Sequence, residues 1–194
     1  MAYEYTGDAH RALQESYRAD AEPFPTETDL VAPERDHPRQ EIEQLKCLFF
    51  PRLWNAGEKV TDLPAIRACL SELGRLFETG MRFYGHEDPA ETVTAVLDQV
   101  PAIRATLKRD VVAAYKGDPA AKSYREIIRS YPGFHALLIH RVAHALYSAG
   151  AREYARELSE CAKTETGIDM PLAEHGVDDT VLDLMYNTAG AVLV

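Results

Sequence analysis

The chain has 194 residues, of which 46% are hydrophobic and 27% charged, and its formal net charge is −10. This length and composition suit one soluble domain with a core of its own. The acidic charge argues against nucleic acid and anionic lipid as partners, because both call for a basic face on the protein.

Residues 1–38 are predicted to form a loosely ordered N-terminal arm. Four prolines interrupt any helix there, and acidic residues are scattered among them. A short helix near residues 9–19 is the one regular element expected in this arm.

A helical domain is predicted from residue 39 to residue 169. Apolar residues after Arg39 recur at spacings of three and four, which places them on one face of a helix. Pro51 is expected to end or kink this first helix, because proline lacks a backbone N–H. Asp62 and Pro64 predict the start of the next helix, which Gly80 or Gly85 should close.

Further helices are predicted along the rest of this domain. Asp88-Pro89 and Pro101 each predict a helix start, and Gly117-Asp118-Pro119 predicts a break followed by a new start. Helices are then expected at 119–129, 132–148 and 151–164. Since no alternation of period two lasts beyond a few residues, the fold class is all-α, a multi-helix bundle of six to eight helices.

Residues 170–194 form a divergent C-terminal tail. Val177, Val181, Leu182 and Met185 recur at helical spacing and predict a modest amphipathic helix. Docking of this tail on its own bundle and docking on a partner both fit the pattern.

The cysteines and the apolar runs indicate a cytoplasmic, non-membrane protein. Cys47, Cys69 and Cys161 are odd in number and form no CxxC pair, which is typical of reduced and mostly buried thiols. No apolar run reaches the roughly eighteen residues of a membrane span, and Met1–Asp20 has no apolar signal core.

Several pieces of the last third of the chain, taken together, resemble the helical domain of serine O-acetyltransferases. They occur in the family's order, and their joint spacing is more specific than any one piece. The pieces are Arg109–Tyr115, Gly117–Ala121, Tyr131–Ala136, His140–His144 and Thr166–Asp169.

The resemblance implies transfer of an acetyl group from acetyl-CoA, the co-substrate, to L-serine in cysteine biosynthesis. It also implies a homo-oligomer, a trimer or hexamer, with cysteine synthase as a candidate partner. By the same match, Asp118 binds the substrate ammonium group, and Asp169 orients a histidine base that normally lies further along the chain. No bound cofactor and no metal is implied.

Beyond Asp169 the sequence departs from the family. Met170-Pro171-Leu172 replaces the start of the hexapeptide repeats that build a left-handed β-helix, and Tyr186-Asn187 stands in the Asp-His position. The expectation is a chain without that β-helix, because three coils of roughly eighteen residues are needed to close its core.

Some of these residues allow a second interpretation. Asp118 could simply cap a helix that begins at Pro119. His140 and His144 have the spacing of a zinc pair, although packing explains them without metal, and the same holds for His135. Lys108-Arg109 and Arg125–Arg129 could anchor CoA phosphates or form a solvated face.

The sequence therefore predicts a serine acetyltransferase-like protein of cysteine biosynthesis. This chain would be the helical assembly domain and inactive alone, so whether it is an enzyme stays open. The alternatives are an oligomerisation or regulatory module for a complete acetyltransferase or cysteine synthase, and a truncated remnant.

Overall fold

The computed structural model describes residues 14–15, 18–19, 38–54 and 61–172. The chain divides into two compact units, residues 1–33 and 34–194, and the helices described below belong to the second. Most of the predicted N-terminal arm, and the whole predicted tail helix, lie outside the described residues.

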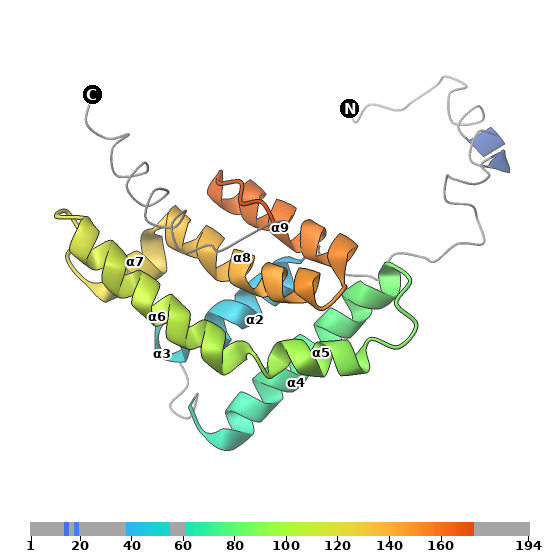
Figure 1. Cartoon of the computed structure of the whole chain (residues 1–194), viewed down its shortest axis with the longest axis horizontal. Helices are drawn as coiled ribbons and strands as arrows, with labels where there is room; N and C mark the ends of the chain where they lie inside the picture. Colours follow the sequence, from blue (N-terminus) through green and yellow to red (C-terminus); the bar gives the residue numbers. More distant parts are fainter. Residues whose placement is uncertain (1–13, 16–17, 20–37, 55–60, 173–194) are drawn as a thin grey trace, which may run out of the picture. The chain divides into compact units, whose positions relative to one another are not determined.

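The described part of the second unit is built of helices, which confirms the all-α prediction (Figure 1). Their number is within the predicted range of six to eight. They are α2 (Arg39–Phe49), α3 (Pro51–Trp54), α4 (Leu63–Phe83), α5 (Ala90–Leu97), α6 (Val100–Gly117), α7 (Tyr124–Ser130), α8 (Pro132–Ser148) and α9 (Arg152–Thr166).

Several prolines lie at helix boundaries, as predicted, although Pro119 does not start a helix. Pro51 opens α3 and so separates it from α2, while Pro64, Pro101 and Pro132 each lie in the first turn of a helix. The first N–H groups of a helix have no intrahelical partner, so a residue without N–H costs nothing there.

The glycine prediction for the end of α4 is correct for Gly85 and wrong for Gly80. Gly85 follows the helix with φ of +82°, a conformation that side chains disfavour. Gly80 lies inside α4, buried against the ring of Tyr154 from α9.

α8 and α9 pack together as a hairpin, and α8 lies in the middle of the helices, where it also contacts α5, α6 and α7 (Figure 1). α2 packs on α4, α4 on α5, and α6 on both α7 and α8. One continuous apolar cluster joins these helices, and its fully buried members include Phe49, Phe77, Leu107, Phe134 and Tyr154. This core fixes α6, α7 and α8 relative to one another, and the candidate site lies where those three helices meet.

Candidate functional site

Asp118 opens the tight turn between α6 and α7. Its backbone carbonyl accepts from the N–H of Ala121 at 3.1 Å, with Pro119 at the second turn position. Its side-chain Oδ1 accepts from the N–H of Ala120 at 2.8 Å. Asp followed by Pro suits such a turn, because proline presets φ and the carboxylate satisfies a turn N–H.

The second carboxylate oxygen of Asp118 is held by a tyrosine from another element. Tyr131 lies at the junction of α7 and α8, and its hydroxyl donates to Asp118 Oδ2 at 2.5 Å. This bond, together with the Ala120 N–H, holds the pKa of Asp118 below its ordinary value, and it raises the pKa of Tyr131 to about 12. At neutral pH the turn therefore presents an ionised carboxylate.

The structure corrects the prediction that Asp118 caps a helix at Pro119. α7 begins at Tyr124, and Ser123 is its N-cap, with Oγ accepting from the N–H of Glu126 at 3.2 Å. Glu126 in turn accepts from the N–H of Lys122 at 2.7 Å. This reciprocal pattern resembles a capping box. It favours a helix start at Tyr124 over a start at Pro119.

Asp169 follows the C-terminal end of α9, on a different element from Asp118. Gly167, with φ of +73°, terminates the helix and turns the chain toward Asp169. The carboxylate is 66% exposed, and its Oδ2 lies 2.8 Å from Lys163 Nζ. Among the described residues, the ammonium group of Lys163 is the ion-pair partner of Asp169.

His140 is buried in α8, whereas His144 is exposed one turn later. Their ring centroids are 6.1 Å apart. Burial, with the nearby His144 and Arg141, lowers the pKa of His140 to about 4, so its imidazole is neutral at physiological pH. In the described part of the chain, no three His, Cys, Asp or Glu side chains gather as a metal site would require.

His135 also packs inside the protein. Its Nε2 lies 2.9 Å from the carbonyl oxygen of Ile128, and its ring lies 5.8 Å from that of Trp54. Burial lowers its pKa. These contacts match the packing interpretation of His135.

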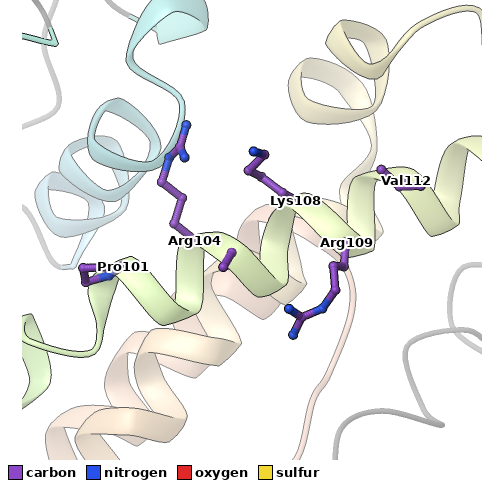
Figure 2. Close-up of a pocket in the computed structure, with 6 residues that line it drawn as sticks. Pro101, Arg104, Lys108, Arg109 and Val112 are labelled. Carbon is purple, nitrogen blue, oxygen red and sulfur yellow. The ribbon is translucent and has the colours of Figure 1, made fainter.

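A basic face lies on the outer side of α6. It lines a pocket of about 450 Å³ bounded by Pro101, Arg104, Ala105, Lys108, Arg109 and Val112. Figure 2 shows Arg104 and Lys108 pointing to one side of α6 and Arg109 to the other. Arg104 donates to the carbonyl of Phe49, and Arg109 to the hydroxyl of Thr106. Diverging cations of this kind fit a solvated face better than a phosphate anchor.

The second basic pair, Arg125 and Arg129 of α7, is also divided between two different surroundings. Arg129 donates to the carbonyl of Leu53 at 3.0 Å and stacks over the ring of Trp54 at 4.1 Å. Arg125 lies exposed on α7. Arg129 thus ties α7 to α3.

The three cysteines are free thiols, as predicted, but each is only half-buried. Burial is the main cause that raises the pKa of Cys47, Cys69 and Cys161. A raised pKa keeps a thiol protonated and unreactive at neutral pH.

Tyr131 is the site residue whose role sequence reasoning missed. It belongs to a segment that resembles the family, yet thirteen positions separate it from Asp118. No periodicity connects two residues across a turn and a whole helix, so only the packed structure brings them together.

Comparison with known proteins places this site in a family context. Residues 85–138, which include Asp118 and Tyr131, match the family model described as "Serine acetyltransferase, N-terminal". The protein named "Serine acetyltransferase, plasmid" of Synechococcus elongatus is 46% identical over 81 residues, which are 42% of this chain and 25% of the relative. The serine acetyltransferase of Bacillus licheniformis is 47% identical over 64 residues, which are 33% of this chain and 30% of that protein.

The fold is similar to solved structures as well. The crystal structure of serine acetyltransferase isoform 3 from Entamoeba histolytica, in complex with cysteine, superposes with a TM-score of 0.65 and 37% sequence identity. The match covers 84% of this chain and 57% of that one. The chain thus corresponds to a quarter to a third of the curated relatives and to somewhat over half of this solved chain.

Proposed function

Because the helical region of this chain belongs to the serine O-acetyltransferase family, we propose that it is the assembly-forming helical domain of a serine acetyltransferase-like protein of cysteine biosynthesis. The reaction it serves converts acetyl-CoA and L-serine to O-acetylserine and CoA. The observation that carries the proposal is the ionised Asp118 carboxylate, held by Tyr131 within the segment that matches the family.

In the proposed reaction the hydroxyl oxygen of L-serine attacks the carbonyl carbon of the acetyl thioester. An imidazole base accepts the hydroxyl proton, the carbon–sulfur bond breaks, and the thiolate of CoA takes a proton as it leaves. Asp118 pairs with the ammonium group of serine and so fixes where the hydroxyl lies. In a complete protein of the family, Asp169 would orient the base.

The 194-residue polypeptide is proposed to be inactive by itself. An aspartate that orients a base must accept the N–H of the imidazole. Here the carboxylate of Asp169 lies 2.8 Å from the ammonium group of Lys163 and is largely exposed. This ion pair with Lys163, seen in the described part of the chain, supports the proposal that Asp169 does not orient a base here.

Release of CoA from acetyl-CoA in the presence of L-serine tests this proposal. The purified 194-residue chain should release CoA no faster than a sample without protein. A complete serine acetyltransferase assayed beside it serves as the positive control. Turnover by the 194-residue chain well above the uncatalysed rate would show that it assembles a working site.

An oligomerisation or regulatory module is the second candidate function, and the start of α4 favours it. Leu63 is 82% exposed there and lines a largely apolar pocket of about 880 Å³, together with Pro64, Ile66, Leu70 and Leu97. An exposed apolar surface of this kind is typical of a contact between proteins. The proposed occupant is a second copy of the chain, in a trimer or hexamer, and cysteine synthase is the alternative partner.

The native mass of the chain in solution tests this second candidate. A trimer or hexamer is expected, and Leu63→Ser should reduce its mass toward that of the monomer. Phe83→Ser, at the opposite end of α4, is the matched control and should leave the mass unchanged. A monomer that also fails to join a complete acetyltransferase or cysteine synthase would favour a remnant.

A further inference from the structure

We propose that Tyr131 is the positioning residue for the ligand-binding carboxylate: its hydroxyl locks Asp118 in the orientation that receives the ammonium group of L-serine. This inference rests on the proposed function, because it requires Asp118 to bind that ammonium group. Tyr131 itself does not touch the substrate. It acts through Asp118.

The geometry leaves Asp118 with bonding capacity for one cationic ligand. Tyr131 donates to Oδ2 at 2.5 Å, and the N–H of Ala120 donates to Oδ1 at 2.8 Å. The N–H of Ala121 also interacts with this carboxylate. A carboxylate offers about four acceptor positions, so these three donors leave one position for an N–H of a primary ammonium group.

Tyr131 is a rigid donor. Its ring is half-buried against the apolar core, and its backbone N–H donates to the carbonyl of Ile127 at the end of α7. Pro132, the next residue, starts α8 and restricts the backbone of Tyr131 to its extended conformation. Two helices therefore hold the hydroxyl of Tyr131 in place. Asp118 lies in an exposed turn, where its side chain could rotate if this hydrogen bond were absent.

The hydroxyl remains a donor over the whole physiological range. The raised pKa of Tyr131, about 12, means that the phenol stays protonated at neutral pH. The same bond lowers the pKa of Asp118 and so keeps the carboxylate charged when the solution is acidified. Loss of the hydroxyl should therefore weaken ligand binding most at low pH.

The test uses Tyr131→Phe in the full chain, with Tyr124→Phe as the matched control. Tyr124 is an exposed tyrosine near the same turn, and its ring packs against Tyr115. Carbon-13 NMR of the Asp118 carboxyl group gives its pKa directly and reports the binding of L-serine. The probe lacking an ammonium group is 3-hydroxypropionate.

Tyr131→Phe should raise the pKa of Asp118, weaken L-serine binding about ten-fold, and move the acid limit of binding to higher pH. Tyr124→Phe should change none of these, and 3-hydroxypropionate should not bind. If wild-type chain binds L-serine and Tyr131→Phe leaves the affinity and the acid limit unchanged, the positioning role is wrong. If the wild-type chain does not bind L-serine at all, the role of Asp118 as the ligand of the ammonium group fails in this chain, and the role of Tyr131 fails with it.

A second variant keeps the test decisive if Tyr131→Phe does not fold. Asp118→Asn removes the negative charge but preserves the ring and the core packing of Tyr131. The pKa of Tyr131 should then fall from about 12 toward the ordinary value for a phenol. An unchanged value would show that the hydroxyl and the carboxylate are not coupled in solution, which would overturn the proposal.

Discussion

Gly80 lies inside α4, where the ring of Tyr154 from α9 crosses the helix. A Cβ at this position would lie 2.3 Å from Cε2 of that ring. The ring is fully buried, its hydroxyl donates to Glu41 at 2.9 Å, and it packs edge-on against Phe77. Because the tyrosine is held at both ends, it cannot move aside for a methyl group.

Gly80→Ala should therefore destabilise the protein by about 1–3 kcal/mol, the usual cost of overpacking a core. Gly74→Ala is the matched control on the same helix, since its Cβ would meet only the flexible ends of Leu97 and Val93, at 3.3 and 3.5 Å. That change should be neutral or stabilising by about 0.5 kcal/mol, because alanine favours helix. Urea unfolding measures both, and equal free energies for the two variants would contradict the argument.

At the scale of elements, α7 is seven residues long and depends on its N-terminal cap. Short helices are marginal by propensity, so satisfaction of their first N–H groups matters more than in long ones. The side chains of Ser123 and Glu126 accept backbone N–H groups at this end, and α7 starts directly after Ser123.

Ser123→Ala should cost about 1 kcal/mol of unfolding free energy, since the hydroxyl no longer accepts the N–H of Glu126. Ser130→Ala, at the exposed C-terminal end of α7, is the control and should change stability little. Thermal or urea unfolding measures the two. If both serines prove equal, the capping interpretation is wrong.

A bidentate ion pair joins α6 to α8. Arg141 donates through Nε and Nη2 to the two carboxylate oxygens of Asp110, each at 3.0 Å, and both side chains are nearly buried. Removing one partner from such a pair costs more than removing both, because a buried charge then loses its compensation.

Arg141→Met should destabilise the protein by about 3–5 kcal/mol, and Asp110→Asn added to it should recover part of the loss. Arg75→Met, which breaks the exposed Glu72–Arg75 pair on α4, is the control and should have a far smaller effect. A double-mutant cycle by urea unfolding gives the coupling energy. Additive effects of Arg141→Met and Asp110→Asn would show that the pair is not coupled.

At the scale of the whole molecule, the formal charge is unevenly placed along the chain. Residues 39–172 carry equal numbers of acidic and basic side chains, so the charge of −10 belongs to residues 1–38 and 173–194. Net repulsion within the helical region is therefore small, and the pH dependence of its stability should follow individual buried groups such as His140.

His140 should make the protein less stable in mild acid. Its pKa is about 4 in the folded chain and about 6.5 when unfolded. Between these values the unfolded chain binds a proton that the folded chain does not, so stability is complete above pH 6.5 and falls as the pH drops toward 4. The loss attributable to His140 is at most about 3–4 kcal/mol.

Melting temperatures of wild type and His140→Phe from pH 7.5 to pH 4 measure this effect. Phenylalanine is similar in shape and does not titrate, and a pocket of about 330 Å³ beside the histidine gives the ring room. The variant should lose less stability over this range than the wild type. Parallel curves for the two proteins would remove His140 as the cause.

Local rules in the sequence predicted much of the fold. Pro51 was expected to end or kink the first helix and separates α2 from α3, Pro101 was expected to start a helix and lies in the first turn of α6, and the predicted helix at 132–148 coincides with α8. These features follow from φ restriction and missing N–H groups, which act within a few residues of the chain.

Among the described residues, no helix has the length and apolar character needed to cross a membrane.

The site itself was predicted only in part. Sequence motifs identified Asp118 and Asp169 as candidates, but the start of α7 was placed too early, and Asp118 was expected to cap it. The partners of the two aspartates, Tyr131 and Lys163, could not be recognised by spacing. Each contact depends on how a turn or a helix end folds back on its neighbours.

The sequence by itself determined the helical class, the positions of most helix ends and the resemblance to a family, because backbone propensity and motif identity are local properties. Only the tertiary structure decided that Gly80 permits a helix crossing and that Tyr131 holds Asp118. Both depend on the distance between residues far apart in the chain, and that distance is set by the packing of the whole core.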